Sequence, residues 1–150
     1  MSLDEIDSKI IVHLMQFGRA TWSDLAALLG LSAPATADRV RRLEDKQIIH
    51  GYSARINPEA VGMHLTAFVA VTLERPEHRA PFLAWVQQQP AIQECHHTAG
   101  DDDYWLKVRC QQTRDLERLV SDELKGLPGV VRSRTTIVLF TVKETPVLPL

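Results

Sequence analysis

The sequence predicts an α+β protein in two parts, with three N-terminal helices followed by strands and helices in the order βαββαβ. Two observations carry this prediction. Apolar residues recur at helical spacing through residues 3–46, and beyond residue 65 nearly continuous apolar runs alternate with helical patterns. We expect a first domain over residues 1–51, a hinge strand and linker over 52–64, and a second domain over 65–150.

The first helix begins near Asp4, with Ile6, Ile10 and Leu14 on one stripe. The segment Thr21–Asp24 fits a capping box that opens a second helix, and Gly30 can end that helix in the left-handed conformation. Ser32 then caps a third helix, with Pro34 in its first turn. Three such helices can bury one small core, and the second and third form a helix-turn-helix.

The third helix carries a local basic patch. Arg39, Arg41, Arg42 and Lys46 supply it, with acidic residues among them. The whole chain has a formal net charge of -2, so nucleic-acid affinity must come from such a patch. The pattern is typical of a DNA reader, but a plain helical bundle or a protein-docking module has the same spacing, and the basic run is also compatible with ordinary solvated surface.

In the second part, strands are expected at residues 66–73, 92–98, 104–110 and 130–142, with helices at 81–88 and 113–125. The order βαββαβ is the ferredoxin-like arrangement, one antiparallel sheet with both helices on one face. Alternation places Tyr104 toward the helices and Trp105 on the opposite face. A face this apolar favours pairing with a second copy, so we expect a homodimer.

The segment 99–104 is a tight acidic turn with Gly100 free to adopt unusual dihedral angles. A carboxylate near exposed backbone N–H groups can hold both ends of a zwitterion, and a free amino acid fits that description. A hairpin turn that is rich in Asp for geometric reasons is the alternative.

Other classes of protein are disfavoured. Cys95 and His97 fall on one face of a strand and His96 on the other, so we expect no metal site. No catalytic triad, phosphate loop or paired-carboxylate cleft is present, so neither an enzyme nor a cofactor is expected. Two cysteines, no leader and no bilayer-long apolar run indicate a reduced, cytoplasmic protein without a membrane partner. A small-molecule sensor that regulates a protein partner without reading DNA remains a competing class.

An ordered set of short segments resembles the Lrp/AsnC family of feast/famine transcription regulators, and the match spans essentially the whole chain. The segments are Leu3–Asp7, Gly18-Arg19, Gly30–Ser32, Arg39–Glu44, Ile49–Tyr52, Ile92–Cys95, Gly100–Tyr104, Leu127–Val130 and Val142-Lys143. The resemblance implies an N-terminal winged helix-turn-helix, a hinge strand around Tyr52, and a ferredoxin-like effector and oligomerisation domain. It also implies dimers that often assemble into octamers, with an amino acid bound between effector domains.

Carried over by residue, the resemblance makes Ser32–Lys46 the recognition helix and residues 100–104 the effector loop. The expected effector-binding residues are Gly100, Asp101, Asp103 and Tyr104, with Asp103 on the amino group and Thr135, Thr136 and Val138 lining the side-chain pocket. The chain departs from many relatives at Gln47, where they have Gly, and at Trp105, where they have an aliphatic residue.

A DNA-binding hypothesis follows for double-stranded DNA. Phosphates would be held by Arg39, Arg41 and Arg42, and bases would be contacted by Ser32, Pro34, Ala35 and Asp38. Few of these side chains make directional base contacts, so we expect a degenerate, A/T-leaning site chosen largely by bendability. Amino-acid binding would bias the assembly state of the regulator.

Overall fold

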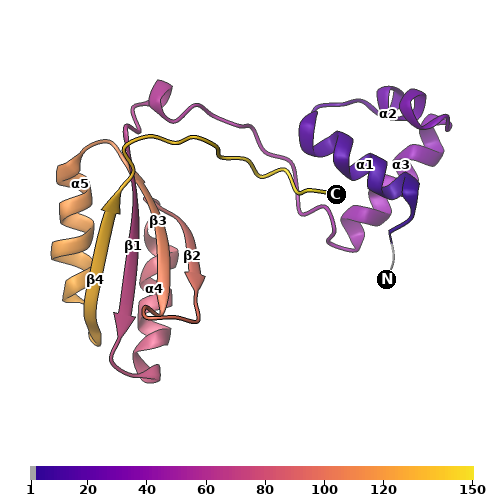
Figure 1. The fold of residues 1–150 in the computed structure, drawn as a ribbon. Coiled ribbons are helices and arrows are strands. Elements are labelled where there is room, and N and C mark those ends of the chain that lie inside the picture. Colours follow the sequence, from indigo (N-terminus) through magenta and orange to yellow (C-terminus); the bar gives the residue numbers. More distant parts are fainter. Residues whose placement is uncertain (1–2) are drawn as a thin grey trace. The chain divides into compact units, whose positions relative to one another are not determined.

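The computed structural model describes residues 3–150 and divides the chain into two compact units (Figure 1). One unit contains the residues up to Arg55 together with Lys143–Leu150, and the other contains Ile56–Val142. The expected boundaries assigned the C-terminal residues to the second domain. In this division residues 143–150 group with the first unit, where the backbone N–H of Leu148 donates to the Met15 Sδ over 3.3 Å, and the domain bounds expected from the sequence stay a prediction.

The first unit contains three helices, α1 (Glu5–Gln16), α2 (Trp22–Leu29) and α3 (Ala33–Asp45). They share one core, whose buried members include Ile10, Leu14, Leu25, Val40 and Leu43. Both halves of the capping box are formed between Thr21 and Asp24 at the start of α2. Gly30 ends that helix at φ 66°, in the left-handed region. The predicted helix-turn-helix is therefore confirmed.

The wing and the hinge strand are not formed in the single chain. Residues 46–57 carry no strand, although they are fully described. Tyr52 is only half-buried and Ile56 is 63% exposed, so this segment has little packing that would hold an extended strand. An isolated extended segment is not stable without a partner for its backbone groups.

The second unit contains β1 (Leu65–Leu73), α4 (Arg79–Gln88), β2 (Ile92–His97), β3 (Tyr104–Cys110), α5 (Thr113–Glu117) and β4 (Val130–Ile137). Short helical turns lie at η1 (Glu59–Val61), η2 (Pro76–His78), η3 (Arg118–Glu123) and η4 (Leu124–Gly126). The strands form one antiparallel sheet in the order β2-β3-β1-β4. This topology confirms the ferredoxin-like prediction.

One face of the sheet packs against α4 and the helical segment that begins with α5 (Figure 1). The buried core on that face includes Val69, Phe82, Tyr104, Leu106 and Leu116. No helix of the described unit covers the other face, where Trp105 lies opposite Ala70 of β1 and His96 of β2.

Strand β4 is shorter than expected, because it ends at Ile137 rather than at residue 142. Only two residues of its partner β1 remain beyond this point: Ile137 lies opposite Ala67, β1 begins at Leu65, and the N–H of Val138 still donates to the carbonyl of Thr66. Beyond that point the side chains of Leu139, Phe140 and Val142 are 81–97% exposed. The apolar run continues, but in a single chain it has nothing to pair with.

Candidate DNA-binding surface and effector loop

Helix α3 begins with a complete cap. Ser32 Oγ accepts a hydrogen bond from the N–H of Ala35, and the buried Thr36 hydroxyl donates to the carbonyl of Ser32. Of the residues expected to contact bases, Ser32, Pro34, Ala35 and Asp38 are all exposed. The N-cap and the first two turns of α3 therefore present these four side chains to solvent, as a recognition helix requires.

The three arginines expected to hold phosphates differ in what they contact. Arg41 and Arg42 are exposed, and Arg41 is paired with Asp38 over 2.8 Å on the same helix. Arg39 instead turns toward α1, where its Nη1 donates to Asp4 Oδ2 over 2.7 Å and to Asp7 Oδ1 over 2.8 Å. The N–H of Asp7, followed by the Arg39 guanidinium, lowers the pKa of Asp4. Arg39 is thus already paired with two carboxylates of α1.

The end of α3 has Gln47 where the family resemblance led us to expect glycine, and this residue is in the left-handed region. Gln47 adopts φ 55° itself, and its side-chain Nε2 donates to the carbonyl of Glu44 over 3.2 Å. The Ile48 N–H donates to the carbonyl of Leu43 over 2.9 Å, which closes the helix end. The helix therefore ends in a left-handed turn made by a residue with a side chain, which carries a conformational cost that glycine would avoid.

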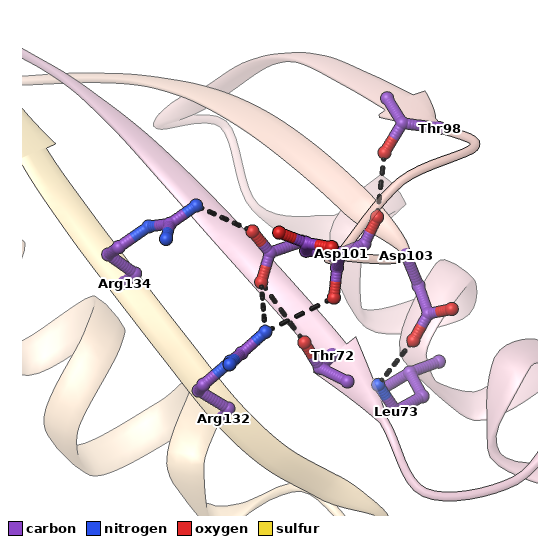
Figure 2. A network of polar contacts seen from close by, with 8 residues as sticks. Thr72, Leu73, Thr98, Asp101, Asp103, Arg132 and Arg134 are labelled. Carbon is purple, nitrogen blue, oxygen red and sulfur yellow. Dashed lines mark hydrogen bonds and ion pairs between the residues drawn. The ribbon is translucent and has the colours of Figure 1, made fainter.

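The effector loop is fixed by its backbone and by two carboxylates (Figure 2). Thr98 donates through its hydroxyl to the Asp102 carbonyl and through its N–H to the Asp103 carbonyl. Asp103 donates its N–H to the carbonyl of Val71 over 2.9 Å and accepts at Oδ2 from the N–H of Leu73 over 2.7 Å. The Asp103 carboxylate is thus held at the end of β1 with a second oxygen left to accept.

Asp102, which sequence reasoning missed, is the buried acid of the loop. Its side chain is 3% exposed, and it accepts from Arg132 Nη2 (3.1 Å), Arg134 Nη2 (2.7 Å) and the Thr72 hydroxyl (3.1 Å) (Figure 2). Arg132 also donates to the Asp101 carbonyl over 3.1 Å. The sequence did contain a signal for this network, because Arg132 and Arg134 are two residues apart on a strand and therefore share a face. This network binds the loop to β4.

The other residues of the effector loop differ in their exposure. Gly100 and Asp101 are exposed, whereas Tyr104 is buried between Phe82 and His97, at ring-centre distances of 4.8 and 5.0 Å. A cavity of about 220 Å³ opens beside them. It is lined by Leu73, Glu74, Arg75, Pro76, Arg79, Asp103 and Tyr104. A small ligand can thus meet the Asp103 carboxylate within one chain.

Thr135, Thr136 and Val138 do not share this cavity. Thr136 lies opposite Phe68, five residues before Leu73 on β1, which places it about 17 Å from the Asp103 end of the strand. Thr135 and Thr136 also point to opposite faces of the sheet, because adjacent strand residues alternate. Within one chain the structure therefore separates these three residues from the effector loop.

The histidines and cysteines do not gather into a site. Within residues 3–150, no three His, Cys, Asp or Glu side chains lie where they could hold a metal ion. Cys110 is buried and Cys95 partly buried, both as free thiols, and burial raises the pKa of each. His96 lies 3.2 Å from Glu94, which also accepts from Lys107. None of the described helices is both long and apolar enough to span a bilayer.

Comparison with known proteins accounts for both units. Residues 3–44 match the AsnC-type helix-turn-helix domain, and residues 66–148 match the Lrp/AsnC ligand binding domain. The HTH-type transcriptional regulator LrpA of Mycobacterium tuberculosis is 43% identical, over 93% of this chain and 92% of its own. The leucine-responsive regulatory protein of Escherichia coli K12 is 39% identical, over 95% and 88% of the two chains.

Solved structures of related regulators share the fold of this chain. A transcriptional regulator from Neisseria meningitidis in complex with L-Met superimposes with a TM-score of 0.94 at 32% identity, covering 99% of this chain and 97% of that one. The feast or famine regulatory protein of M. tuberculosis complexed with L-methionine gives a TM-score of 0.88 at 42% identity, covering 95% and 96%.

A capped, exposed recognition helix joined to an α+β domain with its own small cavity defines a class, the DNA-binding regulators that carry a ligand-binding domain. Both family models match, and the identity of about 40% extends over most of the chain. The chain belongs to the Lrp/AsnC family of transcriptional regulators. Its members regulate transcription and are not enzymes.

Proposed function

We propose that an amino acid bound beside Asp103 controls the assembly or the DNA affinity of this regulator. The observation that carries the proposal is the Asp103 carboxylate, which the Leu73 N–H holds in place at the cavity while one oxygen remains available for an ammonium group. Two related regulators that bind L-methionine in their solved structures support the choice of ligand class.

On DNA, Arg41 and Arg42 contact phosphates, and the first turn of α3 faces the bases. Arg39 contributes by fixing α3 against α1, since Asp4 and Asp7 already occupy its guanidinium. Asp38 must release Arg41 before it can accept from a cytosine amine. Direct readout is therefore weak, and a degenerate, A/T-leaning site is selected mainly through DNA shape.

A homodimer forms through the open face of the sheet. Phe68 and Trp105 are each 37% exposed on it, and the apolar residues 137–142 extend from its edge strand without a partner in the described chain. A second copy supplies the missing apolar contact. Thr135, Thr136 and Val138 can reach an effector loop only from another copy, which fits further assembly of dimers toward an octamer.

Effector binding is then coupled to DNA binding through the assembly state of the regulator. An amino acid that binds one arrangement of subunits more tightly than another shifts the population toward that arrangement, and the spacing of the recognition helices changes with it. Because the target is chromosomal DNA, we place the protein in the cytoplasm.

The test is a DNA-binding titration on the segment upstream of the protein's own gene, with and without each common amino acid. At least one amino acid should change the affinity about fivefold or more and raise the melting temperature. Asp103→Asn keeps an acceptor for the Leu73 N–H but removes the charge, and it should abolish both responses.

Asp122→Asn removes an exposed charge from η3 and serves as the matched control. An Asp103→Asn protein that responds like the parent would overturn the site. Absence of specific DNA binding would favour the sensor that acts on a protein partner.

A further inference from the structure

The cavity beside Asp103 also contains two basic residues that no sequence motif pointed to. Arg75 follows β1, and Arg79 begins α4; both line the same 220 Å³ space as Asp103. A cavity this small suits a free amino acid better than a nucleotide or a peptide, since sites for larger ligands usually enclose about 300 Å³ or more. Two basic residues and two acidic ones, Glu74 and Asp103, therefore line a space sized for a zwitterion.

The two arginines differ in whether their guanidinium groups are already paired. Arg75 Nη1 lies 3.8 Å from Glu77 Oε1 and so has a partner. Arg79 enters no ion pair with any residue from 3 to 150, and its side chain is exposed. A guanidinium in this position can donate two parallel hydrogen bonds to a carboxylate.

Two backbone N–H groups at the loop are already engaged within the protein. The Asp103 N–H is used by the Val71 carbonyl, and the Thr98 N–H is used by the Asp103 carbonyl. A ligand carboxylate beside Asp103 would also lie near a negative side chain unless a cation compensates it. The nearby guanidinium supplies that compensation.

We propose that Arg79 binds the α-carboxylate of the amino-acid effector while Asp103 binds its ammonium group. Leu73, Pro76 and Tyr104 complete the cavity with apolar surface for the rest of the ligand. The assignment makes Arg79 a specificity-determining residue, because it selects ligands that carry a free carboxylate next to the amino group. It rests on the amino-acid effector proposed above.

The experiment compares an amino acid with its α-amide, which keeps the ammonium group but lacks the carboxylate. The twenty common amino acids are screened by thermal shift, and the dissociation constants of the best ligand and its amide are measured by calorimetry. The parent protein should prefer the acid by about tenfold or more. Arg79→Gln should bind the acid as weakly as the amide, while its ligand-free melting temperature stays near that of the parent.

Arg75→Gln removes the same charge from a neighbouring position and should keep the preference, because Arg75 is already engaged by Glu77. Arg79→Gln that keeps the full preference for the acid overturns the role of Arg79 and leaves the effector proposal intact. A parent protein that binds none of the amino acids overturns both. Loss of all binding in Asp103→Asn together with an intact preference in Arg79→Gln would assign the carboxylate to another group.

Discussion

Arg39 on α3 donates a hydrogen bond of 2.8 Å to Asp7 on α1, so a residue in the basic run of the recognition helix serves the helical core. Because this guanidinium is already paired, Arg39→Ala should leave the salt dependence of DNA binding nearly unchanged. The lost contact with Asp7 should lower the free energy of unfolding by about 1 kcal/mol, as measured by denaturant titration.

Arg42→Ala should behave in the opposite way. Arg42 is exposed, so its removal should reduce the slope of log affinity against log salt by about one and change stability by less than about 0.5 kcal/mol. The roles assigned to the two arginines would be contradicted by equal losses of slope in the two variants.

Asp102→Asn should destabilise the second unit by about 1–2 kcal/mol, because it leaves Arg132 and Arg134 without the buried charge that holds them. The cost is moderate, since both arginines remain more than half exposed to water. Thermal unfolding measures this loss of stability. Asp101→Asn is the control at the adjacent position, where only the main-chain carbonyl is engaged, and a similar loss there would argue against the network.

Gln47→Gly should stabilise the first unit by about 0.5–1 kcal/mol, because glycine adopts φ 55° without the steric cost of a Cβ. Some of the gain is offset by the lost hydrogen bond to Glu44. The reverse type of change, Gly30→Ala at φ 66°, should destabilise the first unit. Unfolding free energies that move in the same direction in both variants would exclude this explanation.

Tyr52 donates its hydroxyl to Glu44 over 2.9 Å, and burial, followed by this hydrogen bond and the Glu44 charge, raises the pKa of Tyr52 from 10.0 to about 12. A raised folded-state pKa means that the stabilisation is fully present below pH 10 and is lost as the pH rises through about 12. The difference in unfolding free energy between the parent and Tyr52→Phe should therefore shrink over that window.

The chain has two tyrosines, so a phenolate absorbance titration of both proteins identifies the Tyr52 transition. A stability difference that stays constant between pH 10 and 12 would show that the Tyr52 hydroxyl contributes nothing that depends on its protonation.

Trp105→Glu should shift the protein toward monomers in sedimentation velocity, because it places a charge on the uncovered face of the sheet. Leu83→Glu is the matched control: Leu83 is also 37% exposed but lies on α4, away from that face. Equal dissociation by both variants would remove the sheet face from the interface.

Local chemistry explains what the sequence predicted well. The capping box at Thr21, the left-handed Gly30 and the alternation along β3 each depend on residues within a few positions, so their patterns can be read directly. Errors occurred where a partner decides the structure. The last strand stops at Ile137, two residues short of the end of its partner β1, and residues 52–56 are not a strand because no residue from 3 to 150 pairs with them.

By itself, the sequence determined the two-part organisation and the helix-turn-helix, and it predicted the acidic loop as a candidate ligand site. Only the tertiary structure decided how the charged side chains are used. Arg39 pairs with Asp7 of α1, the buried Asp102 pairs with two arginines of β4, and Arg79 lines the same cavity as Asp103. The physical reason is that a charge acts through its neighbours in space, and these pairs are separated by 24 or more positions along the chain.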